Sequence, residues 1–134
     1  MNISSFDDLL QAARQQTEPQ RLLFVFASAE LPQDSTELQR QDFLAGQGGS
    51  LKPVMCVDKA LDELNSFFDL VEESHQFGGD WRIVFVAALS GISGIAPTPE
   101  AAEKSLQHMV EAIKAGTLGS FIPFDRQGLP VVLG

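Results

Sequence analysis

Two uninterrupted apolar runs dominate the pattern of hydrophobic and polar positions along the chain. One run, Ile83 to Leu89, contains no polar side chain and lies between Gly79 and Gly91, and the other covers Leu22 to Ala27. Short runs rich in β-branched and aromatic residues predict strands with both faces buried. Such a strand needs helices above and below it, so we expect Ile83 to Leu89 at the centre of a layered sheet.

Helical periodicity fills the segments around these strands. Ser5 and Asp8 resemble a capping box before a helix from about Phe6 to Gln16. Thr98-Pro99-Glu100 combines an N-cap, a first-turn proline and a favourably placed acid, which predicts a helix ending at Gly116. Two further helices are expected, one with a thin apolar stripe from Asp34 to about Ala45 and one from about Lys59 to Gln76. The apolar stripe of the second helix consists of Leu61, Leu64, Phe68 and Val71. We also expect a strand at Pro53 to Val57 and a hairpin of Ser120 to Phe124 and Leu129 to Leu133.

This order of elements predicts an α/β or α+β fold in one domain spanning residues 1–134. Strands joined through helices are expected to be parallel, while the closing hairpin is antiparallel. We therefore predict a sandwich built on a mixed sheet of about five strands with four helices.

The composition narrows the class of partner. The chain has 134 residues with 18 acidic and 9 basic side chains, and a net charge of −9 repels nucleic acid and anionic membrane surfaces. The single cysteine excludes an intrachain disulfide and a Cys-x-x-Cys motif. His75 and His108 have no second ligand at metal-binding spacing, so we expect no metal and no cofactor. With no signal peptide or membrane span visible, we expect a cytoplasmic protein.

A candidate ligand-binding rim follows from the predicted topology. If the three inner strands run parallel, their carboxyl ends meet at one sheet edge, where open α/β sheets tend to bind ligands. That edge would collect two carboxylates, two hydroxyls, a thiol and a glycine, from Ser28, Glu30, Cys56, Asp58, Ser90 and Gly91. Alternatively, Asp58 caps the following helix and the serines begin loops, as such residues usually do.

Two features near this rim have simpler structural interpretations. Cys56 stands between apolar neighbours in a predicted strand, so we expect a buried, inert thiol. The loop from Gly91 to Gly94 leads from a strand toward a helix but lacks the residues of a phosphate-binding loop, a dinucleotide fingerprint or a nucleophile elbow. We expect a structural loop in which Ile92 and Ile95 pack their own side chains.

Four segments resemble a group of short bacterial proteins: Pro53 to Lys59, Ile83 to Gly91, Met109 to Gly116 and Phe124 to Arg126. The resemblance spans nearly the whole chain, and some members of the group are labelled ribonucleotide reductase subunit alpha. The catalytic subunit of that enzyme is several times longer and needs a radical-bearing cysteine with a redox pair, whereas this chain has only Cys56. The resemblance therefore implies no catalytic residue.

The sequence contains no complete catalytic constellation. It does contain an acidic helix face between Asp62 and Glu73 and an edge hairpin with apolar side chains. We therefore expect a small non-enzymatic domain that acts by protein contact, through a protein partner or as a homo-oligomer. The alternative is a small-molecule-binding protein or hydrolase-like enzyme that uses the rim around Cys56, Asp58 and Ser90.

Overall fold

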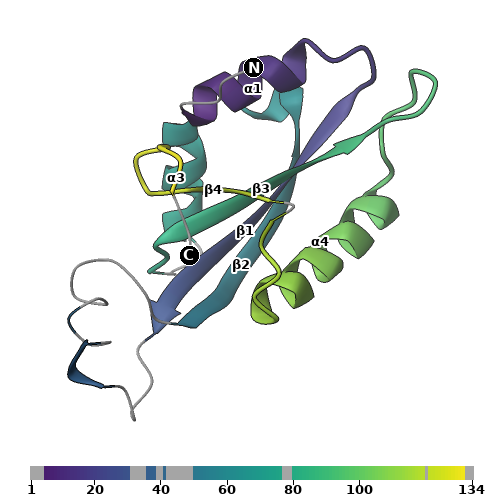
Figure 1. Cartoon of the computed structure of the whole chain (residues 1–134). Coiled ribbons are helices and arrows are strands. Elements are labelled where there is room, and N and C mark those ends of the chain that lie inside the picture. The colour runs from purple at the N-terminus through teal and green to yellow at the C-terminus, as the bar shows by residue number, and fades with distance from the viewer. Residues whose placement is uncertain are drawn as a thin grey trace.

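The computed structural model describes residues 5–30, 36–38, 41, 50–76, 80–119 and 121–131. Within these residues, four strands form one open antiparallel sheet in the order β2-β1-β3-β4. The strands are β1 (Gln20–Glu30), β2 (Ser50–Ala60), β3 (Ile83–Ser90) and β4 (Ile122–Phe124). Helices α1 (Phe6–Arg14) and α3 (Phe67–Gln76) cover one face, and α4 (Pro99–Lys114) covers the other (Figure 1).

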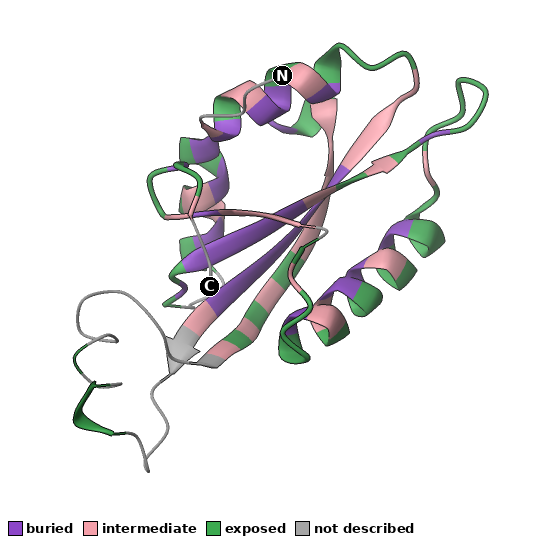
Figure 2. Cartoon of the chain, in the orientation of Figure 1, coloured by how far each residue is buried: buried purple, intermediate pink, exposed green. Residues whose placement is uncertain are grey.

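The core has two halves, one on each face of the sheet. On the α1 and α3 face, the Phe6 ring lies 5.9 Å from Phe24, 5.1 Å from Phe67 and 5.7 Å from Phe124, between ring centroids. The α4 face is more aliphatic, with Leu106, Met109 and Ile113 packed over β1 and β3. Ile83 to Val86 are buried, which confirms the prediction for the first half of the Ile83 to Leu89 run, whereas Ala87 and Leu89 are half-buried and Ala88 is exposed (Figure 2).

Local capping signals placed two helices correctly. The Ser5 hydroxyl accepts a hydrogen bond from the Asp8 N–H at 3.3 Å, and α1 begins at Phe6. The Thr98 hydroxyl accepts one from the Ala101 N–H at 3.1 Å, with Pro99 in the first turn of α4. Both helices bury the apolar stripe that their periodicity predicted.

The prediction of parallel inner strands is wrong. β1 runs antiparallel to both neighbours, with Arg21 opposite Ala60 of β2 and Ala27 opposite Ile83 of β3. β2 and β3 do run in the same direction, but β1 lies between them. A doubly buried apolar run shows that helices cover both faces of a sheet. It does not report strand direction, and an antiparallel sheet can be covered in the same way.

The helix predicted from Lys59 also needs correction. β2 continues to Ala60, because Lys59 still pairs with Leu22 of β1, and a short 3-10 turn (Leu61–Glu63) then precedes α3. The apolar stripe is shifted as well: Phe67 and Leu70 are buried, whereas Phe68 is 69% exposed.

The fifth strand of the prediction is not found among the described residues. In the segment predicted as Leu129 to Leu133, Pro130 forms a single bridge with Phe124. The Val131 N–H donates to the Pro123 carbonyl at 3.0 Å. Residues 132–134 lie outside the described part of the chain. The helix expected from Asp34 to about Ala45 also falls mainly outside it, and its described residues Glu37, Leu38 and Gln41 are helical.

Candidate functional site

The structure separates the six residues of the predicted rim. Ser28 and Glu30 lie opposite Lys52 and Ser50 at one end of the sheet. Asp58 and Ser90 lie toward the other end, where β1 begins. At that end, the Gln20 side-chain amide donates to the Ser90 hydroxyl at 2.7 Å, and the Arg21 guanidinium donates to the Asp58 carboxylate. A single rim cannot form because it required the parallel strands that the sheet lacks.

The loop after β3 is a tight turn. The Gly91 N–H donates to the Pro19 carbonyl at 2.7 Å, and Ser93 and Gly94 have φ angles of 53° and 80°. The Gly94 N–H donates to the Glu18 carboxylate at 2.8 Å. The expectation that the two isoleucines pack together against the loop is wrong, because Ile92 is 78% and Ile95 is 71% exposed.

Cys56 is exposed, which corrects the expectation of a buried thiol. The reason is the position of β2, which is an edge strand of the sheet. Exposed and half-buried residues alternate along its first half, because successive side chains of a strand point to opposite faces of the sheet and the face that carries Cys56 is open to solvent (Figure 2). Among the described residues, no strand pairs with the outer side of β2.

The main-chain directions along β1 decide which groups of β2 face this open side. The Pro19 carbonyl accepts from Gly91 and the Ala27 carbonyl accepts from Arg82, so both carbonyls point toward β3. Main-chain groups alternate in direction along a strand. The odd-numbered residues of β1 therefore pair with β3, and the even-numbered residues pair with β2.

It follows that Cys56 and Asp58 direct their main-chain N–H and C=O groups outward. Their partners on β1 are the odd-numbered Val25 and Leu23, which point away from β2. Among the described residues, neither N–H group donates a hydrogen bond to an acceptor outside the sheet. Backbone groups presented in this way can pair with an added strand.

The open side is closed at both ends of this stretch. Pro53, opposite the odd-numbered Ala27, lacks the N–H that would face outward, and the pairing register shifts between it and Met55. At the other end, the Ala60 N–H donates to the Glu63 carboxylate at 2.8 Å. Proline, bulges and blocked donors are the usual protection of an edge strand. The unprotected window is therefore short and centred on Cys56 and Asp58.

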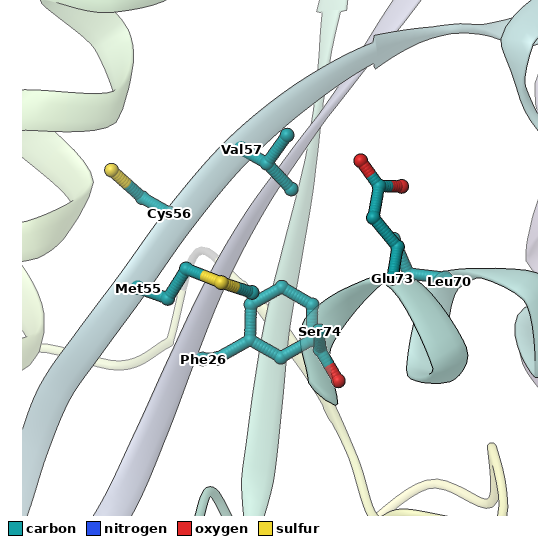
Figure 3. A pocket seen from close by; sticks show the side chains of 7 residues that line it. All are labelled: Phe26, Met55, Cys56, Val57, Leu70, Glu73 and Ser74. Carbon is teal, nitrogen blue, oxygen red and sulfur yellow. The ribbon is translucent and has the colours of Figure 1, made fainter. Parts of the chain in front are cut away.

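An apolar pocket of about 110 Å³ lies beside this window, between β2 and α3. Its walls come from β1, β2 and α3, with side chains of Phe26, Met55, Val57, Leu70, Glu73 and Ser74. The Cys56 side chain points away from these residues, so Cys56 borders the pocket with its main chain (Figure 3). The pocket and the outward-facing groups of Cys56 thus adjoin each other.

The polar groups at the pocket already have partners. The Glu73 carboxylate pairs with the Lys59 ammonium at 2.8 Å, and the Ser74 hydroxyl donates to the Val71 carbonyl and accepts from the Trp81 indole N–H. A side chain that enters the pocket therefore needs no polar group to pair with Glu73 or Ser74. By volume, the pocket is somewhat smaller than the cavity of about 150 Å³ that holds benzene, so it fits one branched aliphatic side chain.

The sequence predictions missed this combination, although Pro53 contained a signal for it. A proline in a strand points to a sheet edge, and Lys52 beside it is typical of an edge as well. The pocket residues on α3 could not be found, because the predicted helix began too early and placed Phe68 rather than Phe67 in its buried stripe.

Comparison of the chain with protein-family models, with characterised proteins and with solved structures found no match. The resemblance to the short bacterial proteins therefore stays a prediction. Within the described ranges, no helix is long and apolar enough to cross a membrane. Among the same described residues, no three His, Cys, Asp or Glu side chains lie close enough together to hold a metal ion.

Proposed function

We propose that the protein is a peptide-binding domain that recognises an extended segment of a partner by strand addition along β2. The observation that supports this proposal is the coincidence of two features at Cys56. Its main-chain groups face the open side of the sheet, and the apolar pocket adjoins the same residue. Strand addition uses such a pair of features, since main-chain hydrogen bonds give affinity and a side-chain pocket gives specificity.

The pocket defines the chemistry of the partner segment. The segment is extended, pairs with Cys56 and Asp58, and inserts one branched aliphatic side chain between Val57 and Leu70. The charges bordering the window are already paired as Lys59 with Glu73 and Arg21 with Asp58, so the segment needs no net charge.

Selection of heptapeptides from a random displayed library on the full chain tests the proposal. We expect enriched sequences to share an aliphatic residue at one position. N-methylation of a selected peptide at successive residues should then weaken binding only at alternate positions, where the amide faces β2. Selection of no peptide, or of peptides that tolerate N-methylation everywhere, would contradict strand addition.

The variant pair Cys56→Pro and Cys56→Ala tests the protein side. Proline removes the outward N–H without removing a hydrogen bond to β1, while alanine keeps it. We expect Cys56→Pro to weaken peptide binding about tenfold or more, because a hydrogen bond is lost and an acceptor is left unpaired. Cys56→Ala should bind as the wild type does, in fluorescence anisotropy titrations with circular dichroism as the check on folding.

Self-association through the same window is the competing outcome. Sedimentation equilibrium of the full chain distinguishes the two. If the wild type dimerises, Cys56→Pro does not and the library yields no peptide, then the strand that pairs with β2 is the β2 of a second copy of the chain and not a partner segment.

A further inference from the structure

A second hollow lies on the opposite face of the sheet, between α4 and β3. Its volume is about 470 Å³, within the usual range for small-molecule sites. The main chain of α4 lies over β1 and β2, and its buried side chains reach only the Ile83 to Phe85 part of β3, so the later residues of β3 are only partly covered. The accessible apolar surface in the hollow comes from Ala87, Ala88, Leu89 and Phe121, while Leu23 and Met109 form its buried floor.

The polar lining of the hollow comes from one side of α4. Lys104, Ser105 and His108 line it, and the first and last are four residues apart, so they occupy the same side of the helix. Among the described residues, neither Lys104 nor His108 is in an ion pair, although Glu100, Glu103 and Glu111 lie on the same helix. Glu111 instead pairs with Lys114 at 3.6 Å.

We propose that this hollow binds an aliphatic monocarboxylate. The hydrocarbon chain lies against Ala87, Leu89 and Phe121, and the carboxylate contacts Lys104 and His108. A neutral apolar ligand would leave both polar groups unused. A polyphosphate would meet a mostly apolar surface with only two basic side chains. The site is independent of the β2 window, which lies at the sheet edge beside α3.

Titration of the isotope-labelled full chain in two-dimensional NMR tests this proposal with three matched probes: octanoate, 1-octanol and octylammonium. We expect octanoate to give saturable shifts confined to residues around the hollow, with 1-octanol weaker by about threefold to tenfold and octylammonium weaker still. Absence of saturation, shifts centred elsewhere, or equal affinity for octanoate and 1-octanol would overturn it.

Two variants separate the charge from the apolar contact. Lys104→Gln combined with His108→Gln should weaken octanoate binding about threefold to tenfold and leave 1-octanol binding unchanged, since exposed ion pairs contribute modestly. Lys114→Gln, on the same helix but outside the hollow, is the matched control and should bind octanoate as the wild type does. Equal loss in both variants would indicate a general effect of net charge and would refute the site.

Discussion

Replacement of Ser74 by alanine should destabilise the protein far more than the removal of one oxygen atom suggests. Ser74 is 1% exposed, and its hydroxyl accepts a hydrogen bond from the Trp81 indole N–H at 2.8 Å. The same hydroxyl donates to the Val71 carbonyl at 2.5 Å. Because Trp81 is buried as well, Ser74→Ala leaves the indole N–H of Trp81 without a partner and without access to water.

The expected cost follows from that unpaired donor. An unsatisfied buried polar group costs about 1–3 kcal/mol, so the free energy of unfolding should fall by that amount in Ser74→Ala. Trp81→Phe removes the indole N–H and part of the ring. When Ser74→Ala is added to Trp81→Phe, the free energy of unfolding should therefore fall much less than it does in the wild type. The double-mutant cycle should therefore give a coupling energy of about 1–2 kcal/mol.

Urea unfolding measured by far-UV circular dichroism provides the four free energies. Fluorescence is unsuitable, because Trp81 is the only tryptophan and two of the three variants lack it. Ser105 is half-buried, and its hydroxyl has no partner among the described residues. Ser105→Ala is therefore the matched control and should change the free energy of unfolding by less than about 0.5 kcal/mol. Additivity of the two substitutions within about 0.5 kcal/mol would refute the assigned hydrogen bond.

Two further substitutions test the local geometry by urea unfolding. Gly91→Ala should destabilise the protein by about 1–3 kcal/mol, because the added Cβ would lie 2.3 Å from the Ile95 carbonyl oxygen. Gly119→Ala, where nothing lies within 4 Å of the added atom, should change stability by less than about 0.5 kcal/mol. Equal effects would contradict the close approach. Thr98→Ala should cost about 1 kcal/mol through loss of the α4 N-cap, and Thr98→Ser should keep most of that stability.

The sequence was most informative where a local pattern determines the structure. The cap at Thr98, the proline that follows it and the apolar stripe down to Ile113 are sufficient to define α4. The Ile83 to Leu89 run likewise identified a strand, and Ile83 to Val86 are buried on both faces as the apolar pattern predicts, although Ala88 is exposed. Both features depend on neighbours within one element, which the sequence displays directly.

Strand direction and helix phase depended on contacts between distant parts of the chain. Nothing in the β1 run distinguishes pairing with a parallel neighbour from pairing with an antiparallel one. In α3, Phe67 and Phe68 are adjacent, and a shift of one residue turns the buried stripe by about 100° around the helix axis. The contact between the Phe6 and Phe67 rings selects the phase, and it joins residues far apart in sequence.

The strand directions also change what Cys56 and Asp58 contribute to the candidate site. In a parallel sheet their thiol and carboxylate would have faced a ligand. In the antiparallel sheet Cys56 directs its side chain away from the pocket and Asp58 pairs with Arg21, while the main chain of both residues faces outward. Peptide binding should therefore tolerate changes of the Cys56 side chain and weaken about tenfold or more when its amide N–H is removed. A thiol-based or carboxylate-based site would show the opposite dependence.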